Sequence, residues 1–205
     1  VVPETADLAA VRAGAAKHVN LSASLLTSAA QDPAHASIVD DAIKWAQKDV
    51  GKRGNRRLVS MHAAERLAVE FAQAMAELIT GRVSIEVDGR LAYKRRATID
   101  KARLLVGHLE ELGVGKERIL IKIPATWEGI EAATTLQAKS GINCHMTLVF
   151  GLHQTAACAD AGVAVIGPAV GRITDYHKKQ DGVEDYAPHQ DPGVIKALQM
   201  RDYLR

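Results

Sequence analysis

The chain has 205 residues, of which 47% are hydrophobic and 24% are charged, and this composition predicts one soluble globular domain over residues 1–205. Lys and Arg together number 26 and Asp and Glu number 24, so the net charge of +2 gives no general attraction to nucleic acid or to an anionic membrane. The apolar stretch between Val149 and Val170 is interrupted by polar residues and glycines, which argues against a membrane span of about 20 residues.

Cys144 and Cys158 are the only cysteines. Two cysteines are too few for a disulfide framework, and their spacing is not that of a metal site, so we expect two buried thiols and no zinc. The chain opens on VVPET without a methionine or a signal-like segment. We interpret this start as trimmed, which leaves the targeting of the protein open.

Short β-rich runs alternate with longer segments of helical period, which predicts βα units around a parallel sheet. One helix is expected around Leu67–Leu78 and another around Leu105–Leu112, with Gly113 and Gly115 ending the second. A last helix is expected from Val194 onward. The six predicted strands, two fewer than a closed barrel of this type requires, are 1–2, 19–21, 82–87, 119–123, 142–150 and 163–167.

Two basic clusters lie at residues 48–57 and 94–103. A nucleic-acid surface would also need stacking aromatic side chains, and aromatic residues make up only 4% of the chain. We therefore interpret both clusters as solvated surface and expect no nucleic-acid partner.

Lys122 lies within ILIKI (119–123), a run that otherwise reads as a buried strand. Such a lysine can point to solvent or pair with a carboxylate, and Lys122 taken alone favours that reading. It can also remain inside for chemistry, because burial disfavours the charged ammonium and the neutral amine attacks carbonyl carbons. Lys122 is then a candidate for Schiff-base formation.

Polar residues near the ends of the neighbouring strands favour the chemical reading of Lys122. Glu86 lies in SIEVDGR, near the end of the preceding strand, and Thr147 lies in CHMTLVF, near the end of the following one. In parallel βα folds the functional groups gather where the strands end. A carboxylate and a hydroxyl beside an amine suit the dehydration of a carbinolamine, in which a proton must reach the leaving water and be recovered.

At this point the sequence resembles the transaldolase family. The likeness runs from Val1 to Arg205 in family order. It is carried by VSIEVDGRLAY (83–93), RILIKIPATWEGI (118–130), GINCHMTLVF (141–150), GPAVGRITDY (167–176) and DPGV (191–194).

The resemblance implies an α/β fold, a TIM-type (β/α) barrel with about six of its eight βα units present in this chain. It further implies transfer of a dihydroxyacetone unit between sugar phosphates, in the pentose phosphate pathway, with no metal and no cofactor. The Schiff-base lysine falls on Lys122, and the glutamate and threonine that organise a catalytic water fall on Glu86 and Thr147. The phosphate-binding arginine falls on Arg172, whose guanidinium suits a phosphate.

Several functional positions depart from the family pattern. Glu4 stands where the family has its general acid/base aspartate, which moves the carboxylate by one methylene, and a shift of about 1 Å can cost about a hundredfold in rate. In HVNLSASL, aligned with the family's DATTNPSL, His18 replaces the aspartate and Ser22 replaces the substrate-binding asparagine.

Two further departures lie in the second half of the chain. His145 replaces an asparagine that hydrogen-bonds the substrate beside the Schiff base, and an imidazole is bulkier and able to titrate near neutral pH. Gly167 replaces a serine that helps to hold phosphate, and glycine has no side-chain donor.

The sequence stops before the family's seventh strand, which supplies another serine and arginine for phosphate. A barrel with two open edges needs a cover, so we expect either a missing C-terminal segment or a protein partner. The departures predict a transaldolase-like protein with impaired or lost activity. The alternative is an inactive homologue that serves as a structural or binding subunit of a larger assembly. The resemblance favours a cytoplasmic location, and the trimmed start leaves an organelle open.

Overall fold

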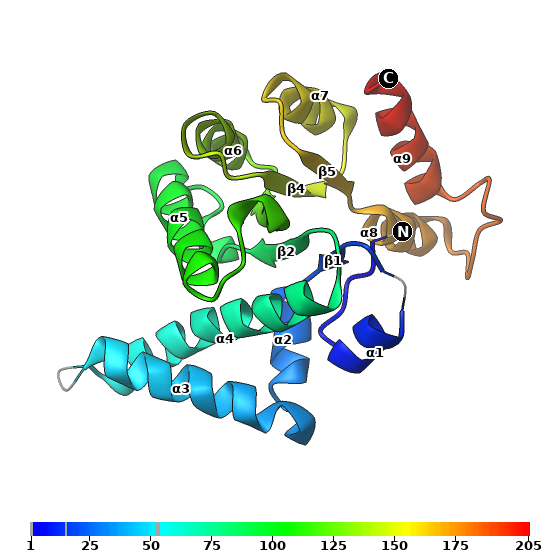
Figure 1. The fold of residues 1–205 in the computed structure, drawn as a ribbon. Coiled ribbons are helices and arrows are strands. Elements are labelled where there is room, and N and C mark those ends of the chain that lie inside the picture. Colours follow the sequence, from blue (N-terminus) through cyan, green and yellow to red (C-terminus); the bar gives the residue numbers. More distant parts are fainter. Residues whose placement is uncertain (1, 15, 52–53) are drawn as a thin grey trace. The chain divides into compact units, whose positions relative to one another are not determined.

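The computed structural model describes residues 2–14, 16–51 and 54–205 (Figure 1). The chain divides into two compact units, which are described separately below. The first unit comprises Val1–Glu86 and Lys101–Ile121, and the second comprises Val87–Asp100 and Lys122–Arg205. Strand β3 and helix α5 each contribute residues to both units.

The first unit contains the strand order β1-β2-β3. Strands β1 and β2 are parallel, with Val19 opposite Val83 and Asn20 opposite Ser84. The elements are α1 (Leu8–Ala13), β1 (Val19–Asn20), α2 (Ala23–Ala29), η1 (Pro33–His35), α3 (Ala36–Val50), α4 (Arg56–Leu78), β2 (Val83–Glu86), most of α5 (Arg95–Glu111), η3 (Lys116–Arg118) and the first half of β3 (Ile119–Pro124).

The N-terminal segment pairs with β1, but not at the residues 1–2 where a strand was predicted. Val1 lies outside the described residues, and Val2 is exposed and in no strand. Pairing occurs instead around Glu4, which forms an isolated parallel bridge to Asn20. Two backbone bonds hold the bridge, from Asn20 N to the Pro3 carbonyl at 2.9 Å and from Thr5 N to the Asn20 carbonyl at 3.0 Å. The six expected strands are thus five strands and one single-residue bridge.

Helix α4 supplies much of the core of the first unit. Its apolar residues recur at helical spacing, and Phe71 and Met75 are completely buried. The rings of His35 and Phe71 pack in a T-shaped arrangement at a centroid distance of 5.1 Å. Helices α3 and α4 run side by side over most of their length (Figure 1). The predicted helix over Leu67–Leu78 is therefore confirmed as the second half of a longer one.

The second unit contains the strand order β3-β4-β5. Strands β4 and β5 are parallel, with His145 opposite Val165 and Met146 opposite Ile166. Helices α8 and α9 pack against each other (Figure 1). The elements are η2 (Gly89–Leu91), the first residues of α5, the rest of β3, α6 (Trp127–Ser140), β4 (Cys144–Val149), α7 (Leu152–Asp160), β5 (Val165–Pro168), α8 (Val170–Asp181) and α9 (Pro192–Tyr203).

The helix ends follow local chemistry. Gly113 has a φ of 83°, so it takes the left-handed backbone expected where α5 ends, whereas Gly115 is extended and precedes η3. Asp191 begins α9: its Oδ1 accepts hydrogen bonds from the backbone N of Gly193 at 2.7 Å and from the Thr174 hydroxyl at 2.6 Å. The DPGV motif is therefore a helix start that also joins α9 to α8. Across the described part of the chain, no helix combines the length and apolarity that crossing a bilayer requires.

Candidate active site

Lys122 lies in β3, all six residues of which are buried. Its side chain is only 4% exposed, so the interpretation of Lys122 as a solvent-directed lysine is wrong. The backbone around it is paired, since Val87 N donates to the Lys122 carbonyl at 3.1 Å. Lys122 is therefore held by regular strand geometry inside the layer of buried β3 residues.

Backbone pairing joins the end of β3 to β4. In a parallel pair of this protein, the backbone N–H of one residue donates to the carbonyl of the residue that precedes its partner. In the Val19–Val83 pair, for example, Val19 N donates to the Arg82 carbonyl. Ala125 N bonds to the Thr147 carbonyl at 2.8 Å. By the same pattern Ala125 pairs with Leu148, so β3 and β4 are adjacent near the ends that carry Lys122 and Thr147.

His145 and Gly167 are matched in size. His145 is 7% exposed, and a Cβ atom added at Gly167 would lie 2.5 Å from its Nε2. A real Cβ atom cannot approach that closely, so the imidazole occupies space that any side chain at residue 167 would need. The imidazole on β4 and the glycine on β5 thus fit together, and a side chain at residue 167 would require the ring to move.

Thr147 lies next to an unusual backbone conformation. It is half-buried near the end of β4, and the following residue, Leu148, has a φ of 56°. The register between β4 and β5 shifts between Met146 and Val149, as in a β-bulge. A left-handed conformation costs a residue other than glycine about 1–3 kcal/mol and persists only where its surroundings hold it. Strand β4 thus stores strain directly after Thr147.

In the first unit, Glu86 contacts the backbone of the residue that follows Ser22. Ser22 precedes α2, but its side chain does not cap the helix. Its hydroxyl instead lies 3.3 Å from that of Ser24. The first N–H of α2, on Ala23, donates to Glu86 Oε2 at 3.2 Å. A carboxylate suits this place because the first turn of a helix presents unpaired N–H groups.

Glu4 and His18 also lie in the first unit. Glu4 is exposed and sits at the bridge to Asn20. His18 precedes β1, and its Nδ1 accepts a hydrogen bond from Arg82 N at 3.0 Å. A Cβ atom at Gly81 would come within 2.7 Å of that nitrogen. His18 therefore fastens the start of β1 to the start of β2, which is a structural task at the amino end of the strands.

Arg172 lies in the first turn of α8 and is exposed. The amino end of a helix carries unpaired N–H groups and a partial positive charge, both of which attract anions. A guanidinium in that turn adds a full charge and a planar set of donors. Arg172 is therefore well placed in its own element to receive a phosphate.

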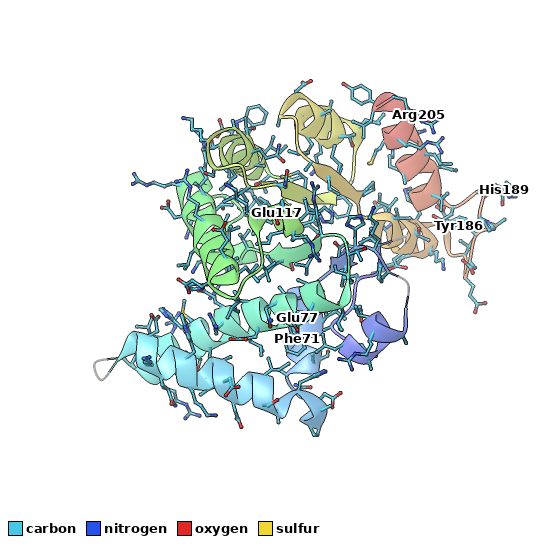
Figure 2. All side chains as sticks on the ribbon, in the orientation of Figure 1. Phe71, Glu77, Glu117, Tyr186, His189 and Arg205 are labelled. Atoms are coloured by element: carbon cyan, nitrogen blue, oxygen red, sulfur yellow. The ribbon has the colours of Figure 1, made fainter. Side chains whose placement is uncertain are left out.

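The described residues of the first unit also form a surface cavity of about 420 Å³, between the end of α4 and the start of β3. Glu77 and Glu117 line it (Figure 2), together with Arg118. The Arg118 guanidinium is already engaged, since it donates to the carbonyls of Ala76 and Ile79. None of the predicted site residues lines this cavity.

The two cysteines are buried, as expected. Burial raises the pKa of the Cys144 thiol to about 12 and that of Cys158 to about 11. Within the described ranges, His, Cys, Asp and Glu side chains form no group of three or more that could hold a metal ion.

Two charged residues pair within the SIEVDGR segment. Arg90 Nε donates to both carboxylate oxygens of Asp88, at 2.9 Å each. Sequence reasoning did not find the strained Leu148, because leucine gives no signal of a left-handed backbone. It also passed over Gln154, three residues after Gly151, although a glutamine in the first turn of a helix is a known capping signal.

Comparisons with known proteins identify the family. Residues 2–205 match the family described as Transaldolase/Fructose-6-phosphate aldolase. A transaldolase of Methylococcus capsulatus is 48% identical over all 205 residues, which are 62% of that protein. A transaldolase of Gloeobacter violaceus is 45% identical over the same 205 residues, which are 52% of its length. The chain therefore spans between half and two thirds of the length of these curated relatives.

Proposed function

The chain belongs to the transaldolase/fructose-6-phosphate aldolase family, and on that premise we propose that it performs Schiff-base aldol chemistry on a sugar phosphate. Membership agrees with the α/β fold described above, a partial TIM-type barrel. The observation that carries the proposal is the burial of Lys122 within an apolar strand. Lysine is rarely buried to this extent, and a buried ionisable group is a candidate functional residue.

The proposed reaction begins with the neutral amine of Lys122. It adds to the carbonyl carbon of a ketose phosphate, and loss of water from the carbinolamine leaves a protonated Schiff base. Thr147 and Glu86, in the roles that the family resemblance implies, hold the water that carries protons in this step. Glu4 then takes the proton from a substrate hydroxyl, and the carbon that bears this hydroxyl separates from the lysine-bound part of the sugar. The aldose leaves, and the bonding electrons remain on the lysine-bound dihydroxyacetone as an enamine.

The second half of the reaction reverses these steps on another aldehyde. The enamine carbon attacks the aldehyde of an acceptor aldose phosphate, the new alkoxide takes a proton, and water releases the product and restores the amine. Arg172 holds the phosphate of donor or acceptor. No electron acceptor or cofactor is required, because the electron pair of the broken bond is stored in the enamine and returned.

We further propose that turnover on the usual ketose phosphate is reduced and that the choice of substrate is shifted. Glu4, Ser22 and the His145–Gly167 pair change the length, size and charge of groups that would meet the sugar. The tight fit of His145 against Gly167 supports a reshaped pocket over random decay, because the two residues accommodate each other. The same departures motivate the second candidate, an inactive homologue with a structural role in an assembly.

Trapping with borohydride tests the proposal. The protein is incubated with fructose 6-phosphate and sodium borohydride, and the added mass is located by peptide mass spectrometry. The expected result is a stable adduct on Lys122, because borohydride reduces the imine to a secondary amine. Lys101 provides a matched control, since it is partly buried and paired with Glu65 at 2.6 Å. Lys101→Met should label like the wild type, and Lys122→Met should not label.

An unlabelled Lys122, under conditions that label an active transaldolase, would contradict the proposal. The structural candidate would gain support if the protein also purified in fixed stoichiometry with another chain. Labelling without transfer to an aldose acceptor would instead indicate an aldolase, in which the enamine is protonated and hydrolysed to free dihydroxyacetone.

A further inference from the structure

Gln154 uses every hydrogen-bonding group of its side-chain amide. Its Oε1 accepts from Phe150 N at 2.9 Å. Its Nε2 donates to the carbonyl of Ala125 at 2.9 Å and to the carbonyl of Leu148 at 3.1 Å. One half-buried side chain on α7 therefore joins the end of β3 to the turn that follows β4.

The position of Gln154 in the sequence explains this reach. It is the third residue of α7, after the N-cap Gly151, and a glutamine there can fold back over the residues that enter the helix. The bond from Phe150 N is this backward contact. The two donor bonds of Nε2 go further, because neither Ala125 nor Leu148 belongs to α7, and capping the helix does not require them.

The two donor bonds end at the backbone next to the proposed chemistry. Leu148 is the residue with the left-handed backbone, and it directly follows Thr147. Ala125 lies three residues after Lys122 on the same chain segment, and its N–H bonds to the Thr147 carbonyl at 2.8 Å. Gln154 thus bonds to the backbone of two segments: the one that follows Lys122, at Ala125, and the one that follows Thr147, at Leu148.

We propose that Gln154 is a positioning residue, which holds the strained turn at Leu148 so that Thr147 keeps its place relative to Lys122. This inference rests on the proposed Schiff-base function of Lys122. Without the Gln154 amide, Leu148 relaxes to an ordinary backbone angle and Thr147 rotates with it. The loss would appear in the chemical step, and the affinity for substrate would change little.

Gln137 provides an internal control of the same kind. Its amide on α6 also makes three backbone bonds: Oε1 accepts from Cys144 N at 3.1 Å and from Ala164 N at 2.9 Å, and Nε2 donates to the Gly162 carbonyl at 2.6 Å. These bonds join the beginnings of β4 and β5, at the opposite end of the strands from Thr147. A change at Gln137 therefore disturbs the same unit without touching the proposed site.

The test compares Gln154→Glu with Gln137→Glu in the full chain. Glutamate keeps the acceptor that each glutamine offers to backbone N–H groups and removes the amide donor. For Gln154→Glu we expect kcat, or the single-turnover rate of borohydride-trapped adduct formation, to fall about 10- to 100-fold, because a displacement of about 1 Å can cost about a hundredfold. KM should change less than about threefold. Gln137→Glu should keep its rate within about twofold of the wild type.

Two further readouts separate positioning from general loss of stability. The activity of Gln154→Glu relative to wild type should rise as the pH falls, because a protonated carboxyl regains one donor for a carbonyl. In a Gln154→Ala background, Leu148→Asn should recover part of the lost rate, because asparagine tolerates the left-handed backbone. The same Leu148→Asn change in a Gln137→Ala background should recover nothing.

The outcomes distinguish this inference from the function on which it depends. If wild-type Lys122 forms no adduct, the proposed function fails first. If Lys122 is trapped and Gln154→Glu reacts at the wild-type rate, the function stands and the positioning role of Gln154 is refuted. Equal losses of rate in the two glutamate variants would also refute it, since they would show only general destabilisation of the unit.

Discussion

The His145 imidazole fills the space that a side chain on Gly167 would need: its Nε2 lies 2.5 Å from the position of a Cβ atom built there. His145 is buried, so the ring has little room to move aside. Either departure from the family pattern, taken singly, looks like damage to a binding site. Together the two residues pack against each other across the neighbouring strands β4 and β5.

A double-mutant cycle tests this pairing. Gly167→Ser in the native chain should destabilise the fold by about 1–3 kcal/mol, the usual cost of overpacking, because the new side chain would press on the buried His145. In a His145→Asn background the same serine should cost about 0.5 kcal/mol or less, because the smaller amide leaves room for it. Unfolding in urea measures both values. Equal costs in the two backgrounds would show that the residues are not coupled.

Removal of the Arg172 guanidinium should weaken the binding of phosphorylated substrates specifically. A hydrogen bond to a charged group contributes about 1.5–3 kcal/mol, so Arg172→Ala should raise KM for fructose 6-phosphate about 10- to 100-fold. KM for unphosphorylated dihydroxyacetone as donor should stay within about twofold. Arg172→Lys should recover only part of the loss, because an ammonium cannot bind phosphate with two parallel bonds. A similar rise for both donors would remove phosphate from the role of Arg172.

The contact between Asp191 and α8 should make the docking of α9 sensitive to acid. The hydrogen bond from the Thr174 hydroxyl, followed by those from Gly193 N and Val194 N, holds the pKa of Asp191 below its usual value of 3.8. The stabilisation is therefore complete above pH 3.8 and is lost as the pH falls through the lower folded-state pKa. Asp191→Ala should lower Tm at pH 7 and flatten its dependence on pH below about 4. Thermal unfolding between pH 2.5 and pH 7 measures this, and an unchanged acid limb would contradict it.

Tyr186 gives the matching prediction at alkaline pH. Its hydroxyl donates to Asp181 Oδ2 at 2.6 Å in the segment after α8 (Figure 2), and this bond raises the pKa of Tyr186 to about 12. The folded state favours the protonated phenol, so the contribution is intact below pH 10 and is lost as the pH rises through about 12. Spectrophotometric titration should show one tyrosine ionising later than the others. Tyr186→Phe should abolish that late step.

The buried thiols should be inert until the chain unfolds. With its pKa raised to about 12, Cys144 is ionised to only about one part in ten thousand at pH 8, and the thiolate is the reactive form. Relative to the chain in 6 M guanidinium, iodoacetamide should therefore modify native Cys144 about a thousandfold more slowly and native Cys158 about a hundredfold more slowly. Rapid alkylation in native buffer would show that the second unit opens readily. The Cys144→Ala variant then identifies which thiol reacts.

Much of the fold could be predicted because the relevant signals are local. The strand expected at 119–123 is β3 (Ile119–Pro124), and the one expected at 142–150 is β4 (Cys144–Val149). Continuous β-branched and apolar runs of this kind suit a strand that is buried on both faces. The pairing expected at residues 1–2 was misplaced, because two valines mark β propensity while the actual contact depends on the backbone of Glu4 meeting Asn20.

The candidate site also has some features that could be predicted from sequence and others that depend on packing. The residues of the site were found by their types and by the family likeness, and the burial of Lys122 agrees with the chemical reading of ILIKI. Trp127, which begins α6 shortly after that strand, is 69% exposed. A side chain at the first position of a helix is free to face either way, and only packing selects the direction.

The sequence by itself determined the order of strands and helices, the candidate residues and the family, because each depends on residue type and spacing along the chain. Only the tertiary structure decided which residues share space. The fit of His145 against Gly167 joins β4 to β5, and the bonds of Gln154 join α7 to the backbone at Ala125 and at the left-handed Leu148. Contacts of that kind depend on the register between strands and on the packing of helices over them, which no single stretch of sequence encodes.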